Sequence, residues 1–388
     1  MDNTIYKYCT GCGLCKSLGK GTLVSDKKGF LHPIEGDENF LKKVCPSYGA
    51  QNELMDHSEI WGKFTDVYYG WSQDNIIRKV SSSGGIITSL CWYLLNEGLV
   101  DGIIHTCVDP QCPTKTKTCI SSSYAELLSR CGSRYCISSP LDTVSKLKRE
   151  NRYAFVGKPC DVDVLRNYMK IDSSLQVNIP YLISFFCMGV PSDDAQKRLL
   201  EFMGCGEHDC VSLRYRGDGW PGLAKAINKD GKEFVTDYES SWGKILGRDL
   251  MPACRFCING IGETADVSAG DAWYLGDDNR PLFNESQGRN VVFARTKKGN
   301  ELLKDALRKK YINLEEYKSF RSELPLSQYA QHERRGTLKA RICALMLLNK
   351  PHPHYRRKLL NGYKKYVSKK IRLRYLKGTL IRMIKEND

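Results

Sequence analysis

The sequence of 388 residues contains no long hydrophobic run. Its longest apolar stretches, such as Leu182–Phe186 and Ile342–Leu348, are far shorter than the ~18 residues that a membrane-spanning helix requires. The first residues, Met1–Lys7, include no apolar signal region. We therefore expect a cytoplasmic protein that does not cross a membrane.

Several nucleotide and metal motifs are also missing. There is no P-loop, and the seven His residues form no HExxH or comparable ligand set. Gly11-x-Gly13 lacks the third glycine of a dinucleotide fingerprint and lies inside a Cys loop. No internal repeat of fixed period is present. NAD binding through a Rossmann site is therefore not supported.

Acidic residues are scarce only in the C-terminal part. From Gln331 to Asp388 there are 17 Lys and Arg against 3 Asp and Glu, whereas the preceding 330 residues are nearly balanced. The net charge of +15 thus belongs to a basic tail. Between Tyr355 and Ile384 apolar residues recur near one helical stripe. Such a helix can lie on anionic lipid at the inner membrane face, contact nucleic acid or an acidic partner, or pack on the body. Nucleic acid is the weakest alternative, because no recognised binding module accompanies the charge.

What the sequence has in abundance is cysteine, with 17 residues. Because the cytosol keeps thiols reduced, clustered Cys there usually bind metal or carry redox chemistry. Two sets of four read as ligands for iron–sulfur clusters, which commonly use four thiolates. We treat the other nine Cys as structural.

The first set is Cys9-x-x-Cys12-x-x-Cys15, completed by Cys45-Pro46. This spacing, with glycines between the Cys and a proline after the last, is typical of a ferredoxin loop that holds a 4Fe-4S cluster. A degenerate relic and a zinc site of four thiolates are the alternatives.

The second set joins Cys254-x-x-Cys257 with Cys160 and Cys187. Cys160 and Cys187 each follow an apolar stretch that predicts a strand, and sites gather at the carboxyl edge of an α/β sheet. Free Cys are also common as small buried hydrophobes, so spacing alone leaves both interpretations open.

The middle of the chain predicts an α/β protein, because strand patterns alternate with helical ones. We expect helices over Gly84–Asn96, Val162–Met169 (with Asp161 as N-cap), Asp193–Met203 and Gly299–Lys309. Strands are expected within 98–104, 153–156, 179–186 and 291–294, and three antiparallel strands between Val211 and Thr236. Beyond Tyr317 regular patterning fades, and two basic helical stretches follow.

Five motifs occur in a fixed order along the chain. They are Val80-Ser-Ser-Ser-Gly-Gly85, Gly157-Lys-Pro-Cys-Asp161, Cys187-Met-Gly189, Cys254-Arg-Phe-Cys257 and Ala265-Asp-Val-Ser-Ala-Gly-Asp271. Over about Met1 to Lys310 the chain resembles the beta subunit family of coenzyme F420-reducing hydrogenase and dehydrogenase. Relatives of that family include formate dehydrogenase beta subunits and a chlorophyll-derivative reductase.

The resemblance implies an iron–sulfur flavoprotein with FAD and two 4Fe-4S clusters. It implies a ferredoxin-like segment (1–55), a flavin-binding N-terminal family domain (66–145) and a mixed-sheet C-terminal family domain with the second cluster (150–315). The charge pattern adds a fourth region, the basic helical tail (331–388). The resemblance also makes FAD the favoured ligand of the Ser-rich stretch.

Hydroxyls and glycine amides at a helix N-terminus suit a flavin diphosphate, although Ser-Ser-Gly is also an ordinary N-cap. Arg134 facing phosphate, Tyr135 stacking and Lys158 near the flavin or cluster are further expected contacts, each with a surface side chain or turn as the alternative. The expected cofactor-binding residues are Ser82, Ser83, Gly84, Gly85, Arg134, Tyr135 and Lys158.

We expect an oxidoreductase that relays electrons between its clusters and FAD to reduce or oxidise a small substrate or a deazaflavin-type coenzyme. A ferredoxin or another redox protein is the expected partner. The alternatives are an electron-transfer subunit without its own substrate, and a zinc-stabilised scaffold that binds a membrane surface or nucleic acid. The expected metal ligands are Cys9, Cys12, Cys15, Cys45, Cys160, Cys187, Cys254 and Cys257.

Overall fold

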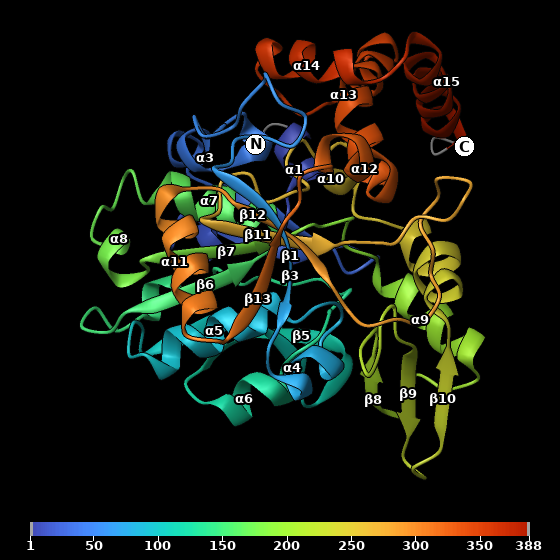
Figure 1. Cartoon of the computed structure of the whole chain (residues 1–388). Coiled ribbons are helices and arrows are strands. Elements are labelled where there is room, and N and C mark those ends of the chain that lie inside the picture. The colour runs from blue at the N-terminus through green and yellow to red at the C-terminus, as the bar shows by residue number, and fades with distance from the viewer. Residues whose placement is uncertain (1–2, 386–388) are drawn as a thin grey trace.

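A mixed eight-stranded sheet forms the centre of the computed structural model, which describes residues 3–385 (Figure 1). Four adjacent inner strands are parallel, and both outer sides are antiparallel. The α/β prediction is therefore confirmed. From edge to edge the strands are β13 (Ile312–Glu316), β3 (Asp66–Ser72), β12 (Asn290–Ala294), β11 (Val267–Asp271), β7 (Tyr181–Phe185), β6 (Tyr153–Gly157), β4 (Gly102–Asp109) and β5 (Cys112–Ser121).

Helices cover both faces of this sheet. Successive strand residues point to opposite faces, so Ala154 packs on one side and Phe155 on the other. The face of Ala154 is covered by α5 (Ile86–Asn96) and α11 (Lys297–Arg308). The face of Phe155 is covered by α7 (Pro159–Tyr168). Shorter helices lie in the connections: α4 (Asn75–Val80), α6 (Tyr124–Ser129), η2 (Val144–Lys146), α8 (Leu175–Asn178), η3 (Glu239–Ile245), η4 (Leu246–Arg248) and α10 (Pro252–Arg255).

Most predicted elements are present, with shifted ends. The predicted N-cap Asp161 is wrong, because α7 begins two residues earlier at Pro159, a residue favoured at the first helical position. Lys158 is the N-cap residue, and its backbone N–H donates to the Asp161 carboxylate at 3.0 Å. Asp161 thus caps the helix from inside its first turn.

The N-terminal segment packs on the α7 face of the sheet. Leu14 and Val44 join the same core as Phe155 and Leu165. Its similarity to a ferredoxin fold stays a prediction. Its elements are α1 (Asn3–Tyr8), α2 (Leu14–Ser17), the hairpin β1 (Gly21–Ser25) and β2 (Leu31–Gly36), α3 (Glu38–Val44) and η1 (Pro46–Tyr48).

A second, three-stranded sheet projects from the body, as Figure 1 shows. It consists of β8 (Cys210–Arg214), β9 (Ala224–Asn228) and β10 (Glu233–Thr236), and its antiparallel order confirms the prediction. Leu199 and Leu200 of α9 (Asp193–Met203) pack against Leu213 and Ala226 of this sheet.

The C-terminal part is more regular than predicted. Four helices follow residue 317, namely α12 (Phe320–Ser327), α13 (Tyr329–Leu347), α14 (Arg357–Tyr363) and α15 (Lys369–Lys385), with the short η5 (Lys364–Tyr366) before α15. Most of α13 lies in the stretch predicted as a basic helical tail, but the hydrophobic pattern did not indicate its inward face, because that face buries the polar residues Gln331, Arg334 and Arg335.

The predicted tail stripe runs through α14, η5 and α15. Its residues Leu359, Tyr363 and Met383 are buried in one core cluster with Trp61 of the body, and Val367 is buried against Gly336 of α13. Packing on the body, one of the alternatives for the tail, is therefore observed for Leu359, Tyr363 and Met383. None of the helices within 3–385 has the length and apolar character needed to span a bilayer.

Candidate functional site

The carboxyl ends of neighbouring parallel strands place the central site. Strand β6 runs into Lys158 and Cys160, and its parallel neighbour β7 runs into Phe186 and Cys187. Strand β11, next to β7, ends at Asp271. As predicted from the apolar strands, these side chains meet at one edge of the sheet.

All four Cys of the second predicted set line one small cavity. Lys158, Gly189, Asn259 and Arg334 also line it, together with Cys160, Cys187, Cys254 and Cys257. The turn after Cys187 needs glycine, because Gly189 has φ 135° and a β-carbon would approach Cβ of Cys254 at 3.2 Å. The two halves of the set therefore touch.

The second set has the surroundings of thiolate ligands. Burial and the neighbouring thiols of Cys187 and Cys257 raise the pKa of Cys254 to about 12, so the free thiols hold their protons and a metal would displace them. The Val190 N–H donates to Sγ of Cys254 at 3.4 Å. Hydrogen bonds of this kind to cysteine sulfur are characteristic of iron–sulfur sites.

A four-iron cluster and a single metal ion make different demands on these residues. Among residues 3–385, no three His, Cys, Asp or Glu side chains lie where they would share one metal ion. In a four-iron cluster each thiolate binds its own iron atom, so its ligands stand further apart. The shared cavity, the four thiols and the N–H donor fit such a cluster.

The first Cys set forms a neighbouring group at the N-terminal segment. Burial raises the pKa of Cys9, and the thiols of Cys45 and Cys15 raise it further. The pKa of Cys12 is raised by burial and then by the Asp161 carboxylate. The Gly11 N–H donates to Sγ of Cys9 at 3.4 Å.

The two Cys sets adjoin each other. Thr10, which lies between Cys9 and Cys12, lines the cavity of the second set. Tyr8 meets Phe256, inside the Cys254-x-x-Cys257 loop, edge to face with ring centroids 5.7 Å apart. Electrons would thus have a short path between the sets.

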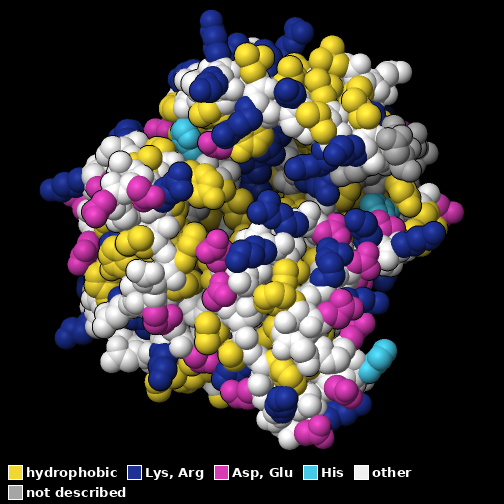
Figure 2. Space-filling model, turned by 90° about the vertical axis from the view of Figure 1, so that its right-hand side faces the viewer, with side chains coloured by type: hydrophobic (Ala, Val, Ile, Leu, Met, Phe, Trp, Pro, Cys, Tyr) yellow, Lys and Arg dark blue, Asp and Glu magenta, His cyan; other side chains and the backbone are white. Residues whose placement is uncertain are grey.

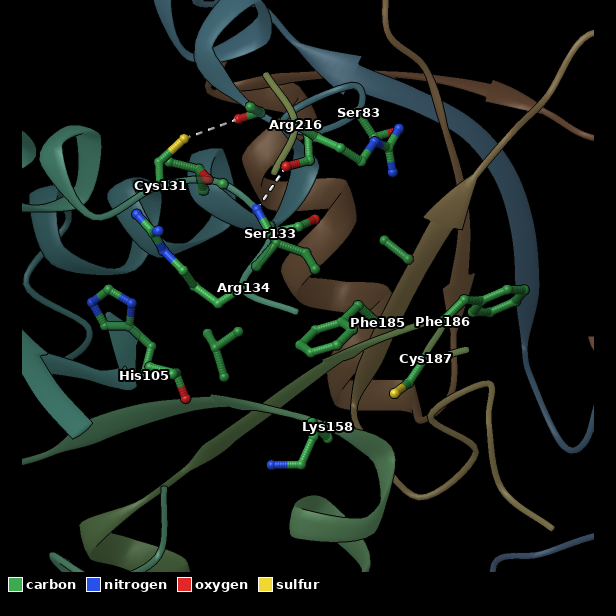
Figure 3. A pocket seen from close by; sticks show the side chains of 18 of the residues that line it. Ser83, His105, Cys131, Ser133, Arg134, Lys158, Phe185, Phe186, Cys187 and Arg216 are labelled. Carbon is green, nitrogen blue, oxygen red and sulfur yellow. Dashed lines mark hydrogen bonds between the residues drawn. The ribbon is translucent and has the colours of Figure 1, made fainter. Parts of the chain in front are cut away.

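A larger cavity of about 290 Å³ lies beside the second set. Figure 3 shows Lys158, Phe185 and Cys187 on one side of it, and Ser133, Arg134 and Cys131 on the other. Gly84 does not line it, because that glycine packs against Gly70 and Asn290. The other predicted cofactor contacts are lining residues: Ser82, Ser83, Gly85, Arg134, Tyr135 and Lys158.

The Ser-rich loop and Arg134 supply polar groups to this cavity. Ser82 accepts a hydrogen bond from the Ser133 N–H at 2.6 Å, and Ser83 donates to the Arg289 carbonyl at 3.0 Å. Arg134 donates from Nη1 to the Leu213 carbonyl at 2.7 Å, but its buried Nε–H has no partner within the described residues. A buried donor without a partner is costly, so Arg134 fits an anionic ligand such as a diphosphate.

Lys158 connects the two cavities. It lines both of them, as do Cys187, Gly189 and Val190. Lys158 is buried rather than solvated, and its Nζ donates to Ser138 Oγ at 2.7 Å and pairs with Asp161 at 2.8 Å. The neighbouring Asp161 and Cys160 raise its pKa against the effect of burial, so it stays charged.

Sequence reasoning missed Cys131 and His105 in the cavity wall, and it considered Arg216 only as part of a substrate-capping loop and Asp271 as a turn carboxylate. Cys131 was treated as structural, yet its thiol lies at the wall, 3.6 Å from Ser81 Oγ. Arg216 is buried and forms a bidentate ion pair with Asp271 at 2.9–3.0 Å. His105 also faces this space, and burial lowers its pKa to about 4. Cys131 precedes the predicted contact Arg134 by three residues, which was the available signal.

Two family models match most of the central chain, and both describe the beta subunit of coenzyme F420 hydrogenase/dehydrogenase. The model of its N-terminal part covers residues 67–146. The model of its C-terminal part covers residues 150–319.

Two curated relatives and one solved structure share this region. The F420-dependent sulfite reductase of Methanocaldococcus jannaschii is 26% identical over 84% of this chain and 50% of its own length. The beta subunit of F420-dependent formate dehydrogenase 1 of Methanococcus maripaludis is 27% identical over 64% of this chain and 60% of its own length. The chain thus spans only half to three fifths of these relatives.

The fold also occurs in a solved complex. A chain of the F420-reducing [NiFe] hydrogenase complex from Methanosarcina barkeri superimposes with a TM-score of 0.58. The match covers 78% of this chain and 97% of that chain at 20% identity. Similarity at this level concerns the fold.

Proposed function

This chain belongs to the coenzyme F420 hydrogenase/dehydrogenase beta subunit family, and we propose that it is an iron–sulfur flavoprotein oxidoreductase. Two 4Fe-4S clusters would carry single electrons, and FAD would exchange them for the two-electron chemistry of a small substrate or a deazaflavin-type coenzyme. Relatives named as F420-dependent oxidoreductases support a redox role.

One observation carries the proposal: the first Cys set, the cavity of the second set and the larger cavity adjoin one another in that order, with lining residues in common. Thr10 of the first Cys loop borders the cavity of the second set, and Lys158 and Cys187 border both that cavity and the larger one. Such an order is what a relay between two clusters and a flavin requires. A scaffold stabilised by separate zinc ions has no need of it.

The residues of the chain have distinct parts in this scheme. The two Cys sets would hold the clusters, and their N–H neighbours would donate to the sulfurs. Arg134 and the start of α5 would bind the diphosphate, while Phe185 and Tyr135 border the space for the ring. The charged Lys158 would favour an anionic reduced form of the group beside it.

The test is to purify the protein without oxygen and to measure its metal and flavin content. Its visible absorbance is then recorded before and after a chemical reductant is added. Bleaching of a flavin spectrum together with cluster absorbance supports the proposal. A colourless protein with stoichiometric zinc would contradict it and support the scaffold.

A second candidate is an electron-transfer subunit that serves a partner enzyme. It is favoured by the fold match, since that structure is one chain of a hydrogenase complex. Bound flavin that accepts electrons without turning over any small substrate or deazaflavin would select this candidate.

A further inference from the structure

Helix α13 reaches the second Cys set from outside the region that the family models cover, since those models end at residue 319. Three inward side chains of this helix donate hydrogen bonds to backbone carbonyls of the loops that carry Cys187 and Cys257. Gln331 Nε2 donates to the carbonyls of Cys187 and Gly260, both at 3.0 Å. Arg334 Nη2 donates to the Cys187 carbonyl at 2.6 Å, and Nη1 donates to the Met188 carbonyl at 3.2 Å.

The fit between helix and loop is close. Arg335 Nη1 donates to the Ile258 carbonyl at 2.5 Å, beside Cys257. A β-carbon at Gly260 would collide with Nη2 of Arg334 and Oε1 of Gln331, so the loop needs glycine where α13 contacts it. Gln331 and Arg335 are almost fully buried, and Arg334 is 5% exposed. These contacts are therefore part of the interior rather than a loose surface association.

The cations around the second set differ in whether a carboxylate compensates them. Lys158 pairs with Asp161 at 2.8 Å, and Arg335 pairs with Glu263 at 2.8 Å. Arg334 lines the cavity of the four Cys but forms no ion pair with any residue in 3–385, and its Nε–H has no partner there either.

One carboxyl opposes Arg334 near Cys257. Asp163 accepts hydrogen bonds from Asn259 at 2.8 Å and from Thr264 at 2.5 Å. Burial raises its pKa to about 7. The guanidinium of Arg334 stays charged, and so does that of Arg341, which forms no ion pair within 3–385 and donates from Nη1 to the Arg255 carbonyl at 2.9 Å.

We propose that Arg334 raises the reduction potential of the second cluster, through a positive charge that pairs with no carboxylate in 3–385 and that α13 holds against the Cys187 loop. The inference rests on the proposed function. Adding an electron to a cluster adds a negative charge, and a nearby cation in a low-dielectric interior stabilises that reduced state. Arg334 thus acts as a tuning residue and exchanges no electron itself.

The experiment is a potentiometric titration of the full-length protein followed by the EPR signals of its clusters. Three variants are compared with the wild type: Arg334→Gln, Arg334→Lys and Lys339→Gln. Lys339→Gln is the matched control, because it removes one positive charge from the same helix. Lys339 does not line the cavity of the second set, and its Nζ donates to Asn361 of α14. We expect Arg334→Gln to shift the midpoint of one cluster to a more negative potential. Arg334→Lys is expected to keep most of the wild-type value, and Lys339→Gln to shift neither cluster.

An unchanged midpoint in Arg334→Gln, or an equal shift in Lys339→Gln, would overturn the proposal. If the Arg334→Gln protein contains no second cluster, the Arg334→Lys protein provides the test. Because it keeps the positive charge, we expect it to contain the second cluster with a midpoint potential close to that of the wild type. Failure of Arg334→Lys to do so would also overturn it. In each of these cases two EPR signals in the wild type leave the proposed function standing. Absence of any cluster from the wild type would instead contradict that function.

Discussion

The two Cys sets have the same chemical composition but lie in different electrostatic surroundings. The Asp161 carboxylate lies beside both sets, since it raises the pKa of Cys12 in the first and of Cys160 in the second. The second set lies between the sheet edge and α13, where Arg334 lowers the pKa of Cys187 and Cys257. If both sets hold 4Fe-4S clusters, the Arg334 charge would favour the reduced state of the second cluster. Such a difference would let one chain separate the potentials of two clusters of the same type without changing a ligand.

The strongest way to break the comparison is to remove one ligand from each set. We expect Cys12→Ser and Cys257→Ser each to lower the iron content from about eight to about four atoms per chain. Only Cys257→Ser removes the cluster beside the larger cavity, so it should also abolish reduction of bound flavin by way of the first set. Iron analysis and stopped-flow flavin reduction measure these effects. Loss of all iron in both variants would show that the two sets form a single site.

Substituting one glycine near each Cys set compares how closely the two sets are packed. Gly189→Ala places a β-carbon 2.8 Å from Cδ1 of Leu250 and 3.2 Å from Cβ of Cys254, at a φ of 135°. Gly19→Ala, near the first set, meets nothing within 4 Å, at a φ of 64°. We expect Gly189→Ala to lower the free energy of unfolding by about 1–3 kcal/mol or more, and Gly19→Ala by roughly 1 kcal/mol. Denaturant unfolding of the two variants measures the difference, and equal losses would contradict the packing described for the second set.

The larger cavity adjoins only the second set, so changes in its wall should affect flavin and leave the iron content unchanged. We expect Arg134→Gln to weaken FAD binding by roughly 10- to 100-fold, because a charged hydrogen bond contributes about 1.5–3 kcal/mol. Arg149→Gln is the control, since Arg149 is exposed and pairs with Asp172 away from the cavity. Flavin fluorescence during titration of deflavinated protein reports the affinity. Equal affinity in both variants would place the diphosphate elsewhere.

The smallest expected effect concerns lipid binding by the outer surface of the C-terminal helices α13–α15. Residues 351–385 contain no Asp or Glu, and Leu373, Ile381 and Ile384 are exposed on α15. Figure 2 shows Lys and Arg side chains beside apolar ones on the upper lobe, where Figure 1 places α13–α15. We predict that vesicles with anionic lipid bind the protein and neutral vesicles do not. Each of Lys369→Gln, Lys370→Gln and Lys377→Gln should cost about 1 kcal/mol of that affinity in flotation assays. Equal flotation with neutral vesicles would contradict this prediction.

Local patterns predicted the parts of the site that follow buried strands. The apolar runs before Cys160 and Cys187 located both residues at one sheet edge, because parallel strands end together. Cys254 and Cys257 come from the short helix α10 and its loop, and only tertiary packing brings them to that edge. The predicted basic helical tail (331–388) covers most of α13, but the apolar pattern gave no indication of its inward face, which carries Gln331, Arg334 and Arg335 paired with backbone carbonyls. Long-range hydrogen bonds of this kind leave no periodic trace in a sequence.

The central claim is that the two Cys sets hold clusters in series with a flavin. The most direct measurement is the iron, sulfide, zinc and flavin content of the wild-type protein purified without oxygen. About eight iron and eight sulfide atoms with one FAD per chain is the predicted result. A protein that contains no iron and no flavin, or zinc in their place, would contradict the account.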